Sequence, residues 1–281
     1  MDLLTVETFA RPTDSDGLRA LQPTLGSDRT LLGGGTWLFS VPQPHLRGVV
    51  DLTSLPWEPV SADDTGLTIA ATTTLATLAA VEPSSFPSWP GVALFAGCCE
   101  ALVGSRKIWN VATVGGNVCL ALPAAPMVTL AAALDGVATL WSADGRERRE
   151  PVADLVVGVQ RTSLAPDDVL RSVHLPAAAL RGRTALRKAS LSPLGRSAVL
   201  LAGRRDDDGR LTLAVTAALP RPAVLRYDVL PDEAALAADV AALGETVGGG
   251  WYDDPHGSPE WRRAMTLLLA EEIRRELGGA R

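Results

Sequence analysis

The chain has 281 residues, of which 47% are hydrophobic and 21% are charged, proportions typical of a globular protein with one large or two modest domains. Its 26 basic and 32 acidic side chains give a net charge of −6, which argues against a nucleic-acid-binding surface. Three cysteines without a C-x-x-C pair are too few for an iron–sulfur centre or a disulfide framework.

The sequence also argues against a membrane or secreted location. Residues Met1–Thr5 have neither the basic region nor the apolar core of a signal peptide. The apolar segment Pro123–Leu134 is too short to span a bilayer. Because few cysteines also favour a reducing compartment, the sequence predicts a soluble, cytoplasmic protein.

Short strands and helices alternate through the first part of the chain. Apolar runs bounded by Gly, Pro and polar residues predict strands, and 3.6-residue spacing after Thr73 or Thr74 predicts a capped helix. We expect strands at 30–32, 48–52, 67–71, 137–141 and 168–175, and helices at about 75–81, 91–103 and 126–134.

The pattern changes after residue 183. Three strands are expected at 185–190, 198–204 and 211–219, and two helices follow at about 232–243 and 259–277. A run of strands followed by helices is typical of an α+β unit. We therefore expect a domain boundary near residues 177–183.

Two glycine-rich segments, Gly33–Thr36 and Thr113–Asn117, offer peptide N–H groups that no Cβ shields. Neither segment matches G-x-G-x-x-G or the Walker pattern, so a Rossmann fold and a P-loop are disfavoured. Two such segments far apart in the chain suggest a ligand with two phosphates held between separate parts of the fold. Gly115 and Gly116 let the backbone approach a ligand, Thr113 offers a hydroxyl, and Asn117 can fix the turn through its side-chain amide.

Few side chains suggest catalysis. The three histidines are scattered, so no metal site is expected, and no G-x-S-x-G nucleophile elbow occurs. Cys119 lies close enough to the second glycine segment to approach a ligand, although simple packing is the favoured interpretation. Trp37 and Trp109 each lie beside a glycine segment, where they either stack on an aromatic ring or pack in the core.

Several motifs occur in a recognisable order: Gly33–Trp37, Ala112–Asn117 (A-T-V-G-G-N), Val169–Pro176, Ala217–Pro222 and Gly257–Arg262. Together they resemble the FAD-binding medium subunit of the molybdenum hydroxylases. This family includes the flavoprotein component of carbon monoxide dehydrogenase and the FAD domain of xanthine dehydrogenase. The resemblance covers nearly the whole chain.

The resemblance implies an α+β fold with a two-subdomain FAD-binding domain of the PCMH (vanillyl-alcohol oxidase-like) type over residues 1–178. Its subdomains would cover about 1–55 and 56–178, and a small α+β C-terminal domain would cover 183–281. FAD would lie between the two subdomains, with its isoalloxazine ring where the two domains meet. No metal would be bound by this chain.

The resemblance also implies which residues contact FAD. The two glycine segments would hold the pyrophosphate through peptide N–H groups, and a basic residue at Arg187 would contact the flavin. Pro126 stands where the family commonly has an Asp that contacts the cofactor. The expected cofactor-binding residues are Gly33, Gly34, Gly35, Thr36, Trp37, Trp109, Thr113, Val114, Gly115, Gly116, Asn117, Val169, Leu170 and Arg187.

In this family, electrons from a molybdenum cofactor pass through two [2Fe–2S] clusters on partner subunits to the flavin, and then to NAD, oxygen or another acceptor. The sequence therefore predicts an FAD-dependent oxidoreductase subunit that transfers electrons between iron–sulfur and molybdopterin partners and a small-molecule acceptor. Two alternatives stay open. In the first, the chain is a free-standing flavoenzyme with its own small substrate. In the second, it is a non-catalytic scaffold with a degenerate FAD site.

Overall fold

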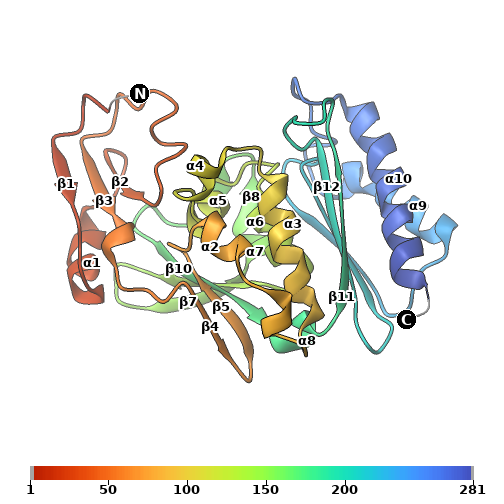
Figure 1. Cartoon of the computed structure of the whole chain (residues 1–281). Helices are drawn as coiled ribbons and strands as arrows, with labels where there is room; N and C mark the ends of the chain where they lie inside the picture. Colours follow the sequence, from red (N-terminus) through yellow and green to blue (C-terminus); the bar gives the residue numbers. More distant parts are fainter. Residues whose placement is uncertain (1–2, 280–281) are drawn as a thin grey trace.

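The computed structural model describes residues 3–279 and begins with a small parallel sheet (Figure 1). Its strand order is β1-β3-β2, and all four residues of the central strand β3 are buried. The helix between the first two strands is capped by Asp14, whose carboxylate accepts a hydrogen bond from Gly17 N at 2.7 Å. The elements are β1 (Thr8–Ala10), α1 (Ser15–Leu21), β2 (Arg29–Leu32) and β3 (Gly48–Asp51).

An antiparallel sheet follows, with the order β4-β5-β10-β6-β7. Its central strand β10 pairs with β5 on one side and β6 on the other, and its apolar residues are buried where α5 and α8 pack against it. A short hairpin, β8 with β9, lies before β10 in the chain. The strands are β4 (Val60–Asp63), β5 (Gly66–Ala70), β6 (Val137–Trp141), β7 (Glu147–Pro151), β8 (Val156–Gly158), β9 (Arg161–Thr162) and β10 (Val169–Pro176).

Helices fill the centre of the molecule between this sheet and a second antiparallel sheet (Figure 1). Every residue of α6 is buried, because the helix packs against α3, α5 and the strands of the second sheet. The helices are α2 (Leu75–Ala79), α3 (Leu94–Ala101), α4 (Arg106–Trp109), α5 (Val114–Leu120), α6 (Pro126–Ala133), α7 (Val152–Leu155) and α8 (Ala177–Leu180).

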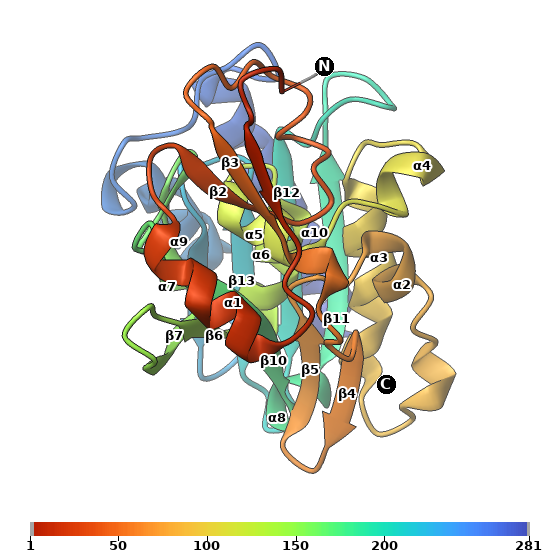
Figure 2. The same ribbon diagram turned by 90° about the vertical axis from the view of Figure 1, so that its left-hand side faces the viewer.

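The second antiparallel sheet has the order β11-β12-β13-β14, and α9 and α10 cover its outer face (Figures 1 and 2). Because α6 covers the inner face and α9 and α10 cover the outer face, β13 is buried along its whole length. The elements are β11 (Arg183–Ala189), β12 (Val199–Arg205), β13 (Leu211–Thr216), β14 (Ala223–Tyr227), α9 (Glu233–Thr246) and α10 (Pro259–Gly278).

The expected long strands and helices are present, and the α+β class is confirmed. The expected strand 211–219 ends earlier, at Thr216, because Ala217 adopts a left-handed φ of 62°. The sequence pattern missed several short elements, among them α1, β4 and β14. The domain boundary near 177–183 stays a prediction. Within residues 3–279, no helix is long and apolar enough to cross a membrane.

One buried arginine joins the start of α10 to one end of the two central strands of the second sheet. The Arg262 side chain is 1% exposed, and its guanidinium donates to the carbonyl oxygens of Ala198 (2.5 Å) and Ala217 (2.6 Å) and forms an ion pair with Asp254. Burial lowers the pKa of this guanidinium, and the Asp254 carboxylate opposes the shift. The interaction therefore ties the residue before β12 to the residue after β13, at one end of this strand pair.

We expect Arg262→Met to lower the free energy of unfolding by about 3–5 kcal/mol, because buried carbonyls and a carboxylate lose their partner. Arg263→Met is the matched control, since Arg263 is the next residue and is exposed. Urea denaturation of both variants measures the difference. Equal stabilities would contradict the structural role of Arg262.

Candidate functional site

The two glycine-rich segments touch each other. A Cβ on Gly34 would lie 1.6 Å from the carbonyl oxygen of Val111, and one on Gly33 would lie 2.6 Å from Thr113 Oγ1. Gly35 has a φ of 69°, in the left-handed region that favours glycine. These glycines are therefore required by the contact between the segments and by the turn itself.

The second segment starts helix α5, and the chain itself uses its peptide N–H groups. Those of Val114 and Gly115 donate to backbone carbonyls in the loop before α2, at 2.9 and 2.8 Å. That of Gly116 donates to the Thr113 hydroxyl at 3.0 Å, so Thr113 is the N-cap of the helix. The second segment therefore forms a rigid wall whose first N–H groups are already satisfied.

The first segment differs in this respect. Within residues 3–279, the peptide N–H groups of Gly33, Gly34, Gly35 and Thr36 have no hydrogen-bond acceptor. Unpaired neighbouring N–H groups of this kind form a concave site for an anion. The peptide N–H groups that are free to bind an anion thus belong to the first segment. The sequence suggested instead that both segments supply such groups.

A cavity of about 520 Å³ opens between the two segments, within the size range of small-molecule sites. One face of α5 forms part of its wall, because Thr113, Gly116, Asn117 and Leu120 follow helical spacing and all line it. The side-chain oxygen of Asn117 accepts a hydrogen bond from Met127 N at 2.9 Å, which joins α5 to the start of α6. The sequence suggested that Asn117 fixes its own turn, whereas its side-chain oxygen joins two helices.

The first segment supplies the opposite wall through Gly33, Gly34, Gly35, Thr36 and Trp37. Trp37 therefore borders the cavity, as expected for a residue that contacts a ligand. Cys119 is exposed and also lines the cavity, so its approach to a ligand is sterically open.

Several expected residues lie outside the cavity. Val169 and Leu170 are buried in β10, and Trp109 is buried in α4 with the Arg106 guanidinium 4.7 Å from its ring centre. Val114 and Gly115 are buried on the inner side of α5. Pro126 is buried as the first residue of α6.

Arg187 points away from the cavity. Its guanidinium hydrogen-bonds to the carboxylates of Glu272 (2.8 Å) and Glu276 (2.5 Å) on α10. Successive residues of a strand face opposite sides, and Leu186 packs toward α3. The next residue, Lys188, therefore shares the inner face with Leu186, and burial lowers the pKa of its amine.

None of the expected FAD contacts lies at the far end of the cavity. Leu102, Val103 and Leu122 line it there, together with Arg196 from the connection between β11 and β12. Nothing in the sequence pattern marked Arg196, because it lies in a loop without a recognisable motif. It enters the site only through the packing of the second sheet against the central helices.

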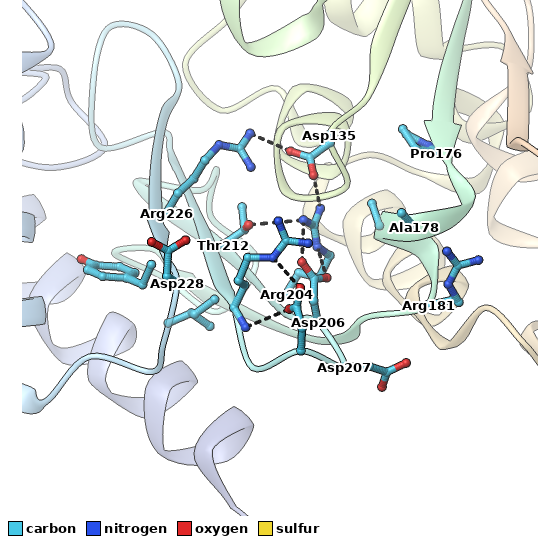
Figure 3. Close-up of a pocket in the computed structure, with 15 residues that line it drawn as sticks. Asp135, Pro176, Ala178, Arg181, Arg204, Asp206, Asp207, Thr212, Arg226 and Asp228 are labelled. Atoms are coloured by element: carbon cyan, nitrogen blue, oxygen red, sulfur yellow. Dashed lines mark hydrogen bonds and ion pairs between the residues drawn. The ribbon is translucent and has the colours of Figure 1, made fainter.

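A second pocket, of about 420 Å³, lies between the α6–β6 turn, α8 and the β12–β13 hairpin (Figure 3). Among the described residues, five aspartates and four arginines line it. The nearly buried Arg204 pairs with Asp135 (2.7 Å) and Asp206 (2.8 Å), and Arg226 also pairs with Asp135 (2.6 Å). Because carboxylates outnumber guanidinium groups, this pocket is a poor site for a pyrophosphate.

Solved structures share the fold of the whole chain. Carbon monoxide dehydrogenase from Oligotropha carboxidovorans matches with a TM-score of 0.82 and 21% identity, covering 98% of this chain and 99% of that chain. The carbon monoxide dehydrogenase from Hydrogenophaga pseudoflava gives 0.81 and 20%, covering 96% of both chains. Quinoline 2-oxidoreductase from Pseudomonas putida 86 gives 0.78 and 20%, covering 99% and 98%.

A sequence relative and a family model agree with these structures. Xanthine dehydrogenase from Oryza sativa subsp. japonica is 34% identical over 84 residues, which are 28% of this chain and 6% of that protein. This match therefore spans a small part of the rice protein. The model of the FAD binding domain in molybdopterin dehydrogenase matches residues 5–178, more than half of the chain. The chain thus belongs to the family of FAD-binding domains of molybdopterin dehydrogenases, whose cofactor is FAD.

Proposed function

We propose that the chain is the flavin-carrying electron-transfer subunit of a molybdenum hydroxylase-type complex. In this role it receives electrons from an iron–sulfur partner and delivers them to NAD or another small acceptor. The carbon monoxide dehydrogenase relatives include one described as a Cu,Mo enzyme. An iron–sulfur and a molybdopterin subunit are the partners that the sequence resemblance implies.

The cavity suits FAD. The unpaired N–H groups of residues 33–36 would hold the pyrophosphate, and the Thr113 hydroxyl, which accepts one hydrogen bond from Gly116 N, still has a hydrogen to donate. FAD supplies the electron-carrying chemistry when it is bound. The chain's own contribution is to position the cofactor and to exclude water with apolar side chains such as Leu120 and Leu122.

The observation that carries the proposal is the lack of a base in the described lining of the cavity. Desolvation raises the pKa of its one thiol, Cys119, to about 12, so this thiol stays protonated at neutral pH. Among its described lining residues, none is an Asp, Glu, His, Lys or Tyr. Proton abstraction from an organic substrate normally needs such a group within hydrogen-bond reach. An electron relay does not need one, so this lining favours the relay over an enzyme with its own substrate.

The other untested assignments are part of the same proposal. We place the FAD-binding domain at residues 1–178 and the α+β C-terminal domain at 183–281. The first glycine segment, Trp37, Thr113, Gly116 and Asn117 are the proposed contacts with FAD. The three cysteines are free thiols, which fits a location in the cytoplasm.

We expect Gly116→Val to weaken FAD binding at least tenfold. A Cβ on Gly116 would lie 2.9 Å from Thr113 Oγ1 and would meet no other atom within 4 Å. The added branched side chain therefore displaces this hydroxyl and extends into the cavity. Overpacking of this kind costs about 1–3 kcal/mol. Titration of the apoprotein with FAD, followed by flavin fluorescence, measures the dissociation constant.

Gly26→Val is the matched control. A Cβ on Gly26 would have no neighbour within 4 Å, and Gly26 lies outside the cavity. FAD affinity should be unchanged in this variant. If Gly116→Val binds FAD as tightly as Gly26→Val, the cavity is not the FAD site.

The relay itself is tested by the composition of the native assembly. A tagged full-length chain purified from its host should elute together with FAD, iron and molybdenum in constant ratios across the peak. Elemental analysis and flavin extraction measure those ratios. A homogeneous chain that carries FAD and oxidises a small substrate without iron or molybdenum would instead support a free-standing enzyme.

A further inference from the structure

The cavity has two chemically different ends. Its polar end is formed by residues 33–36, whose peptide N–H groups have no acceptor among the described residues. This segment contacts α5 at Thr113, the N-cap of the helix. The other end of the cavity is lined by Leu102, Val103 and Leu122. Because α5 has seven residues, the two ends are about 10 Å apart.

The second sheet borders the apolar end. The Ser197 hydroxyl donates to the carbonyl of Ala101, next to Leu102, at 3.4 Å. The peptide N–H of Ala217 donates to the carbonyl of Pro123, next to Leu122, at 2.7 Å. Arg196 precedes Ser197, so its backbone is fixed at this end of the cavity.

Arg196 is the one charged side chain among the described residues that line the cavity. Arg196 as a residue is partly exposed, and within residues 3–279 its guanidinium has no hydrogen-bond or ion-pair partner. A cation without a partner is stabilised by a negative charge that develops nearby. The pyrophosphate would bind at the opposite end, where the main-chain donors lie.

We infer that Arg196 raises the reduction potential of the bound flavin by stabilising the negative charge that the ring gains on reduction. This inference rests on the proposed function. Two electrons from the donor and one proton from solvent leave one negative charge on the flavin ring. Reduction places the negative charge on the flavin ring, while the adenine half of FAD gains none. The end of the cavity with the single cation therefore suits the flavin ring. Arg196 would therefore favour the reduced over the oxidised cofactor.

Arg196→Gln removes the charge, and Arg196→Lys keeps it. In Arg196→Gln we expect the affinity for the reduced cofactor to fall about tenfold relative to the oxidised one. For a two-electron couple, this ratio corresponds to a potential lower by about 30 mV. Dithionite titration of the FAD-loaded chain with a redox dye of known potential measures the shift.

Arg196→Lys should keep a potential close to that of the unmodified chain. Arg181→Gln is the control for net charge, because Arg181 is exposed and lies outside this cavity. It should leave the potential unchanged. A shift of equal size in Arg181→Gln would overturn the inference.

Two further results would also overturn it. If Arg196→Gln leaves the potential unchanged but lowers the affinity for oxidised FAD tenfold, Arg196 pairs with the pyrophosphate instead. If it changes neither quantity, the guanidinium has no role toward the cofactor. In both cases FAD still binds and the proposed function stands, whereas failure of the unmodified chain to retain FAD would contradict the proposed function itself.

Discussion

The site depends on one steric constraint, the contact of two backbones at Gly34 and Val111. A side chain at Gly34 would overlap the Val111 carbonyl, so the chain can bring the two segments together only with glycine at this position. That contact places the open N–H groups of the first segment beside α5. Hydrogen bonds from the second segment to the loop before α2 then hold the arrangement.

The two segments have different physical roles despite their similar composition. The first leaves its N–H groups without acceptors, while the second uses its own to begin a helix. The glycines of both segments permit close packing, and Gly116 alone faces open space apart from its helix cap. A glycine-rich motif can therefore reflect backbone contact as much as ligand contact.

The sequence was sufficient to predict the strands and helices with strong apolar periodicity, the α+β class, the family and the FAD cofactor. It could not predict on which face of β11 the Arg187 side chain lies. Successive residues of a strand face opposite sides, so a shift of one residue decides between α10 and the central helices. Nor could it identify Arg196, since that residue reaches the cavity through contacts between segments about a hundred positions apart. Short elements such as β14 carry too few residues for a periodic signal.

The bonds made by Arg262 have a consequence for biosynthesis. This residue belongs to α10, yet it holds the carbonyls of Ala198 and Ala217, which adjoin the apolar end of the cavity. On the ribosome, both glycine segments emerge long before α10 does. This end of the pocket can therefore be held in place only after α10 has left the ribosome.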